Sequence, residues 1–209
     1  MNTFHVNTGS KKVFECITAF TAFFAIGVQA YLTTGSIGNL FSYFTILTNL
    51  LVAITVTANL IFPKTNVGNF FNRPTVKTSI ALCIFIVALV YNTVLRGLVT
   101  FNGWNLFVDT LLHVIVPILY IIYWFMYVSK GTLQFKHGLN WLYFPFAYLL
   151  YSLIRGAIYG WYPYPFLNVQ DFGYSKVLFN SIILIAVFML SGFALIGLDK
   201  RLGKRKIIE

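Results

Sequence analysis

The sequence predicts an all-α membrane protein, a six-transmembrane-helix bundle with both termini in the cytoplasm. Apolar residues make up 58% of its 209 residues and charged residues only 10%, whereas soluble proteins carry about 25% charged residues. The apolar residues fall into six segments of roughly 20 residues, which is the length that crosses a bilayer. We therefore expect a single transmembrane domain, residues 1–209, with no room for a soluble domain.

Charged residues, prolines and turn-forming residues mark the ends of these segments. Lys11 and Lys12 precede the first, and a turn rich in glycine, serine and asparagine at 34–39 separates it from the second. Pro63 ends the second segment, because proline cannot continue a helix, and a loop that includes Pro74 leads to the third.

The later segments are separated in the same way. A turn at 101–105 carries Trp104, a residue typical of the membrane interface. Gly131 lies in the turn that stops the fourth segment, and a loop rich in aromatic residues and prolines, 161–167, follows the fifth. The predicted spans are residues 13–32, 40–62, 76–99, 106–128, 139–160 and 176–198.

The positive charges predict the orientation in the membrane. Twelve of the 15 lysines and arginines lie before the first span, in the second and fourth loops, or in the C-terminal tail. The other side keeps Lys176 in a loop, while Arg96 and Arg155 fall within spans. The positive-inside rule then predicts a multi-pass protein of the cell (cytoplasmic) membrane with cytoplasmic termini.

The net charge of +10 would also suit a nucleic-acid-binding protein. The positions of the charges follow the membrane topology instead, so we expect no nucleic-acid partner. The basic C-terminal tail is expected to contact anionic lipid headgroups. Cys16 and Cys83 lie within apolar segments, so we expect no disulfide. We also expect no cofactor and no metal, because histidine, cysteine and carboxylate residues do not cluster at ligand spacing.

Polar side chains converge on the outer half of the predicted bundle. Depth follows from about 1.5 Å of rise per residue along each span. Ionisable groups inside a membrane are costly and usually face a bundle interior or a wet cavity. The sequence therefore predicts one shared pocket at this level. Its candidate members are Thr45, Asn49, Asn92, Arg96, Asp109, His113 and Arg155.

The fourth segment carries the most unusual of these residues. Asp109 and His113 are four residues apart and lie on one helix face. Pro117 has no N–H, so the carbonyl of His113 loses its usual helical donor and the helix is expected to bend around the site.

Each candidate also has a purely structural interpretation. The two arginines could extend to the outer interface, and Asp109 could be an acid favoured by the helix dipole. His113 could be a core histidine bonded between helices. Thr45 could bond to its own helix backbone, as threonine often does in helices.

Three stretches of the chain resemble a known family. They are 42–49, which reads Ser-Tyr-Phe-Thr-Ile-Leu-Thr-Asn; 109–117, with a histidine four residues before a proline; and 164–167, which reads Tyr-Pro-Phe-Leu. In order, spacing and span number, the chain looks like a bacterial-type relative of the androgen-induced and androgen-dependent tissue-factor-pathway-inhibitor-regulating proteins. Asp109 and the Arg155-Gly156 pair depart from the animal members, which concerns the substrate more than the fold.

The resemblance implies an intramembrane threonine hydrolase that cleaves fatty acid esters of hydroxy fatty acids, with Thr45 as nucleophile and His113 as base. A hydroxyl needs an adjacent base to attack an ester, and imidazole is suited to that role near neutral pH. We expect Asp109 to orient His113. Further candidates, either for oxyanion stabilisation or for holding a fatty-acid carboxylate, are Asn49, Asn92, Arg96 and Arg155.

Two other functions fit the same residues. A non-enzymatic transporter or binder of a small anion or lipid would use Arg96 and Arg155. A structural or regulatory membrane subunit would use the polar cluster only to join helices.

Overall fold

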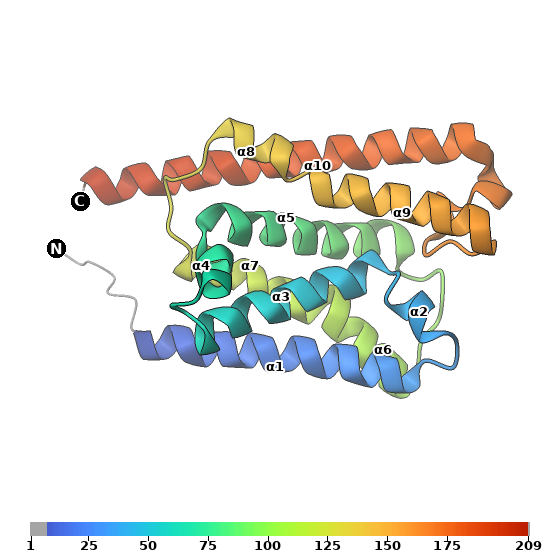
Figure 1. Ribbon diagram of the computed structural model, residues 1–209, viewed down its shortest axis with the longest axis horizontal. Coiled ribbons are helices and arrows are strands. Elements are labelled where there is room, and N and C mark those ends of the chain that lie inside the picture. The colour runs from blue at the N-terminus through green and yellow to red at the C-terminus, as the bar shows by residue number, and fades with distance from the viewer. Residues whose placement is uncertain (1–7, 209) are drawn as a thin grey trace.

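The computed structural model describes residues 8–208, and this part of the chain is helical with no strand. Five of its helical segments are long and apolar enough to cross a membrane, as the composition predicts. They are Thr8–Leu32 (α1), Phe44–Ile61 (α3), Pro74–Leu95 (α5 and the π-helix η1), Gly103–Tyr127 (α6, the π-helix η2 and α7) and Val169–Lys204 within α10. A sixth, α9 (Tyr143–Tyr159), has 17 residues and runs alongside α10 (Figure 1).

Successive long helices run in alternating directions, so the bundle has two distinct ends (Figure 1). The end where α1 begins and α10 stops, here called the terminal end, also carries α4 (Asn66–Asn72). The opposite end, here called the α2 end, carries the short helix α2 (Ile37–Leu40) and the loop between α9 and α10. That loop contains the 3-10 turn η3 (Pro165–Leu167).

The second long helix begins later than the sequence predicts. Residues 37–40 form α2 as a separate short helix, with the Ser36 hydroxyl accepting from the Gly38 N–H at 3.2 Å. The chain then turns, and α3 begins only at Phe44. Thr45 therefore lies in the first turn of α3 and not one turn inside a continuous helix.

The last two long helices also differ in extent from the predicted spans. Residues 135–140 form a separate short helix, α8 (Phe135–Asn140), so that α9 begins at Tyr143 and not near residue 139. Helix α10 (Val169–Ile208) extends beyond its predicted span at both ends and is interrupted at Gly173, whose φ of 70° suits glycine.

Small and aromatic residues build the interior. Ala22 and Ala25 of α1 are fully buried, and such small residues let helices approach closely in a membrane. Helix α7 (Val116–Tyr127) contributes Tyr120, Tyr123 and Trp124, all fully buried. The Trp124 indole N–H donates to the Thr78 hydroxyl at 2.8 Å. A large aromatic core thus carries internal hydrogen bonds, which lipid could not provide.

Asp199 fixes α10 to the linker between α7 and α8. Its buried carboxylate accepts hydrogen bonds from the backbone N–H groups of Gly131 and Leu133, both at 3.0 Å. Gly203 and Gly131 lie so close that a Cβ at residue 203 would be 2.4 Å from the Gly131 Cα. These contacts hold the linker before α8, and with it α8 and α9, against α10. Helix α9 in turn contacts the first turn of α3.

Candidate functional site

Two tyrosine hydroxyls from other elements cap the first turn of α3. The side chain of its own N-cap residue, Tyr43, makes no capping hydrogen bond. The backbone N–H of Phe44 donates to the Tyr148 hydroxyl at 3.2 Å, and that of Thr45 donates to the Tyr164 hydroxyl at 3.1 Å. These N–H groups have no partner inside the helix, so groups from other elements must satisfy them. The start of α3 is therefore tied to α9 and to the loop after it.

The hydroxyl of Thr45 forms hydrogen bonds to other elements and not to its own helix. Its Oγ1 lies 3.3 Å from His113 Nε2 and 3.2 Å from the Tyr164 hydroxyl. Several threonines elsewhere in the chain instead donate to the carbonyl four residues earlier, among them Thr18, Thr55, Thr78 and Thr110. The structural interpretation of Thr45 as a backbone-bonded threonine therefore does not describe its contacts.

The surroundings of His113 decide which ring nitrogen carries the proton. Nδ1 lies 3.0 Å from a carboxylate oxygen of Asp109 and 2.9 Å from the Asp109 carbonyl oxygen. Both are acceptors, so the neutral imidazole is protonated at Nδ1 and leaves Nε2 free to accept. The Thr45 hydroxyl then donates to Nε2, and Asp109, His113 and Thr45 form a continuous hydrogen-bonded series.

Two π-helical turns place these side chains. The turn η2 (Leu111–Ile115) holds His113, and its bond from the Val116 N–H to the Leu111 carbonyl spans five residues. It ends two residues before Pro117, which cannot donate the regular helical bond to His113. The second turn, η1 (Tyr91–Leu95), ends with the Arg96 N–H donating to the Tyr91 carbonyl at 2.7 Å. Such turns are rare and often occur at functional sites.

Tyr91 supports the acid and the imidazole together. Its hydroxyl donates to the second carboxylate oxygen of Asp109. Its ring stacks on the His113 ring, with centroids 4.0 Å apart and planes inclined by 14°. Asp109 is buried, so these partners replace the water that a carboxylate would otherwise need.

Tyr164 is the contact of Thr45 that sequence reasoning did not assign to the site. Its hydroxyl accepts from the Thr45 N–H and can donate to Thr45 Oγ1. Burial raises the pKa of Tyr164 to about 12, so the hydroxyl stays protonated as a donor. The sequence signal was the Tyr-Pro-Phe-Leu stretch at 164–167, which carried the family resemblance but suggested no role.

Asn49 holds the two helices of the site together. Its side-chain nitrogen donates to the Thr45 carbonyl at 2.8 Å and to the Leu112 carbonyl at 3.1 Å. The residue is fully buried and lines neither of the two cavities described below. Asn49 thus fixes α3 against η2 and does not point a donor toward a bound molecule.

The structure places Asn92, Arg96 and Arg155 away from Thr45. Asn92 and Arg96 are exposed and hydrogen-bond each other at 3.1 Å. Arg155 donates to the Asn39 side chain at 2.5 Å and packs over the Trp161 ring, 4.7 Å from its centroid. None of the three lines either cavity. Arg155 instead joins α9 to the short helix α2.

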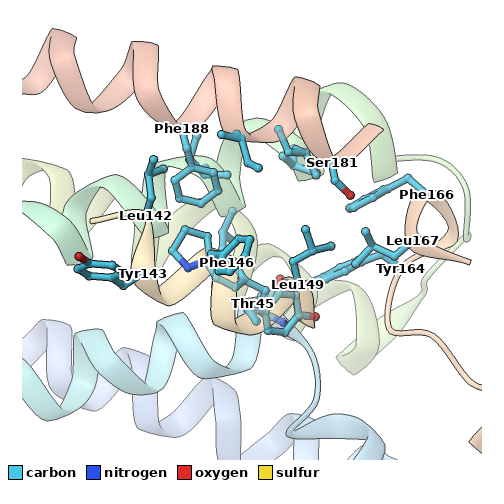
Figure 2. Close-up of a pocket in the computed structure, with 18 of the residues that line it drawn as sticks. Thr45, Leu142, Tyr143, Phe146, Leu149, Tyr164, Phe166, Leu167, Ser181 and Phe188 are labelled. Carbon is cyan, nitrogen blue, oxygen red and sulfur yellow. Dashed lines mark hydrogen bonds between the residues drawn. The ribbon is translucent and has the colours of Figure 1, made fainter. Parts of the chain in front are cut away.

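Two cavities meet at Thr45. The apolar cavity, about 300 Å³, lies between α3, α5, α9 and α10 and is lined by aliphatic and aromatic side chains. Figure 2 shows Leu142 and Tyr143 toward one side of it and Tyr164 and Leu167 toward the other. The polar cavity, named for the ionisable groups of His113, Asp109 and Asp171 in an otherwise largely apolar lining, measures about 530 Å³ and lies at the α2 end. Thr45, Leu95 and Tyr164 line both cavities.

Comparisons with models of protein families, with curated proteins and with solved structures find no match. The resemblance to the androgen-induced family stays a prediction. Within residues 8–208, no three histidine, cysteine or carboxylate residues lie close enough to hold a metal ion.

Gly156 offers a test of how the loop that carries Tyr164 is held. A Cβ at this position would lie 2.0 Å from a ring atom of Tyr162, so Gly156→Ala forces that ring to move. Overpacking of this kind costs about 1–3 kcal/mol, so we expect a lower unfolding temperature for the purified protein. Gly27→Ala is the matched control, because its Cβ meets nothing within 4 Å. Equal unfolding temperatures for the two variants would show that Tyr162 moves freely.

Proposed function

We propose that this protein is an intramembrane hydrolase of lipid esters, with Thr45 as nucleophile and His113 as general base. The observation that carries the proposal is the series from Asp109 through His113 to Thr45, with a nucleophile, a base and an orienting acid in hydrogen-bonding distance. The series lies beside an apolar cavity, where a lipid tail can be held. Arg96 and Arg155, on which the transporter alternative depends, line neither cavity.

The first half of the reaction forms an acyl-enzyme. Thr45 Oγ attacks the ester carbonyl carbon while its proton passes to His113 Nε2, and the carbonyl electron pair moves onto oxygen. The imidazolium is stabilised by Asp109, which already accepts from Nδ1. When the oxyanion collapses, the alcohol oxygen leaves and takes the proton from Nε2. The acyl group then remains on Thr45 as an ester.

The second half restores the enzyme. Water attacks the acyl-threonine carbonyl and gives its proton to His113 Nε2. Collapse breaks the bond to Thr45 Oγ, which takes the proton back. The products are one carboxylic acid and one alcohol from one ester and one water, with no net change in the protein.

Tyr164 is the donor we assign to the oxyanion. Its hydroxyl oxygen lies beside Thr45 Oγ and accepts a hydrogen bond from the Thr45 N–H. Its own proton can therefore be donated to the ester carbonyl oxygen as negative charge develops there. The same oxygen would lie near the N-terminus of α3, where the helix dipole favours negative charge. Asn49, Asn92, Arg96 and Arg155 are not needed for this role.

We further propose that all six long helices span the cell membrane, with the terminal end in the cytoplasm and the site in the outer leaflet. The asymmetry of basic residues between the two ends supports this orientation. Lys200, Arg201 and Lys204 near the end of α10 would then face anionic lipid headgroups on the cytoplasmic side. Arg205 and Lys206 continue this basic run in the sequence, with side chains outside the described part of the structure.

The nucleophile is tested by labelling with a fluorophosphonate probe, which reacts with activated hydroxyls. Thr45→Ala and His113→Ala should abolish labelling while expression stays normal, whereas Thr45→Ser should retain it. Thr48→Ala is the control, because Thr48 is buried one turn further along α3 and lines neither cavity. Full labelling of Thr45→Ala would exclude Thr45 as the nucleophile.

The role of Tyr164 predicts a particular pH dependence of ester hydrolysis. The donor is the protonated hydroxyl, and the raised pKa of about 12 extends that form to higher pH. The rate should therefore hold constant on the alkaline side through pH 10, the ordinary pKa of tyrosine, and fall only closer to pH 12. Tyr164→Phe should lower kcat by about 10²–10³-fold, as loss of an oxyanion donor does. An alkaline decline with its midpoint at or below pH 10, absent in Tyr164→Phe, would contradict the assignment.

The orientation is tested by cysteine labelling in intact cells. In a background with Cys16 and Cys83 replaced by serine, Gly35→Cys lies at the α2 end in open space, and Lys136→Cys lies exposed near the terminal end. A membrane-impermeant maleimide should label Gly35→Cys and spare Lys136→Cys until the cells are lysed. The reverse pattern would invert the topology.

A further inference from the structure

The two cavities at Thr45 give the two arms of an ester separate directions. An ester carbonyl carbon carries an acyl chain on one side and an alcohol oxygen on the other. A carbonyl held at Thr45 would have one arm in each cavity, because Thr45, Leu95 and Tyr164 form the boundary between them. The acyl chain could lie in the apolar cavity and the alcohol in the polar one, or the reverse.

The position of His113 decides between these two arrangements of the ester. The leaving alcohol oxygen must take its proton from His113 Nε2, so it must lie on the side of that nitrogen. His113 lines the polar cavity and does not line the apolar one. The alcohol arm therefore lies in the polar cavity, and the acyl chain points away from His113 into the apolar cavity.

The apolar cavity suits an acyl chain that arrives from the bilayer. Among its lining residues, Leu139, Tyr143 and Phe146 are exposed on the side of the bundle, so the cavity reaches the lipid-facing surface there. Its volume of about 300 Å³ holds roughly ten groups, if each methylene takes about the 30 Å³ share of a water molecule. A medium-length chain fits inside, and the end of a longer chain would extend into lipid.

The polar cavity suits an alcohol that carries no negative charge. Its lining includes the side chains of Gln29, Asn168 and Asp171 in addition to Asp109. No lysine or arginine is among the described residues that line it. Arg96, near Tyr91 at the rim, is bonded to Asn92. A carboxylate on the alcohol arm would thus face two acids without a cationic partner.

We propose that the site takes a fatty acyl ester of a small polar alcohol that is neutral or cationic, with the acyl chain in the apolar cavity and the alcohol in the polar cavity. This assignment rests on the proposed hydrolase function and deepens it. It separates the products, since the fatty acid is released toward lipid and the alcohol toward the outer aqueous side. It also differs from the hydroxy fatty acid esters that the family resemblance implies, whose alcohol arm carries a carboxylate.

The orientation of the ester is tested with a reversed pair, using the full-length protein in lipid nanodiscs. Decanoyl glycerol has an apolar acyl arm and a polar alcohol arm, while decyl glycerate has the same two arms exchanged. The proposal expects kcat/KM for decanoyl glycerol to be at least about tenfold higher, a ratio that pocket fit can supply. Equal or reversed preference would overturn the assignment of the arms.

Two variants test the cavities separately. Ser181 is buried on α10 and lines the apolar cavity, so Ser181→Phe should lower kcat/KM for decanoyl relative to butanoyl glycerol by about tenfold. Leu178→Phe, on the exposed face of the same helix, is the control and should leave the ratio unchanged. Asp171→Asn should raise the rate on a decanoyl ester of glycolic acid relative to decanoyl glycerol, because it removes one of the two acids.

The outcomes separate this assignment from the proposed function. Hydrolysis of these esters with an unchanged chain-length ratio in Ser181→Phe would overturn the apolar cavity as the acyl site. Preference of the unaltered protein for the glycolic acid ester would overturn the neutral or cationic alcohol. Hydrolysis of none of the esters, together with absent fluorophosphonate labelling, would overturn the hydrolase function itself.

Discussion

The proton on His113 Nδ1 is the constraint on which the site depends. Because Asp109 offers this nitrogen two acceptors, its side chain and its own carbonyl, the neutral ring can accept only at Nε2. Thr45 is then oriented as a donor toward the ring, and its remaining lone pairs are left to Tyr164. These groups are largely buried and each needs a partner, so reversing one bond would leave a neighbour unsatisfied.

The backbone of two helices is adapted to this series. In α5 and η1, the π-helical turn begins at Tyr91, whose hydroxyl donates to Asp109. In η2, the π-helical turn contains His113 and ends directly before Val116 and Pro117. In a regular helix, the side chains that follow each of these turns would point in other directions around the helix axis. The extra residue in each π-helical turn therefore decides which side chains face the site. Pro117, for which the sequence predicts a bend, thus accounts for the local widening of the helix at η2.

The sequence predicts the class of fold well, because long apolar segments leave few alternatives in a chain of this composition. It also places Thr45 and His113 at similar depth, since both follow from counting along helices that enter from the same side. It could not give the break at 41–43 that puts Thr45 in a first turn, nor the hydroxyl of Tyr164, which reaches Thr45 from 119 residues away. Depth in the membrane can be estimated from the sequence, but the direction in which a side chain points around its helix cannot. For this reason the predicted site included Asn92, Arg96 and Arg155, which the structure places elsewhere.

A comparison of two buried acids, Glu15 and Asp109, shows why Asp109 is the one suited to the proposed reaction. Glu15, near the terminal end, accepts from the Tyr123 hydroxyl at 2.8 Å and lies 3.8 Å from the Lys11 amine. These contacts join α1 to α7. Asp109 also accepts from a tyrosine, but its second partner is an imidazole, which can gain a proton. A positive charge formed on His113 during an attack by Thr45 would meet a carboxylate already in contact, and no group would have to move to stabilise it.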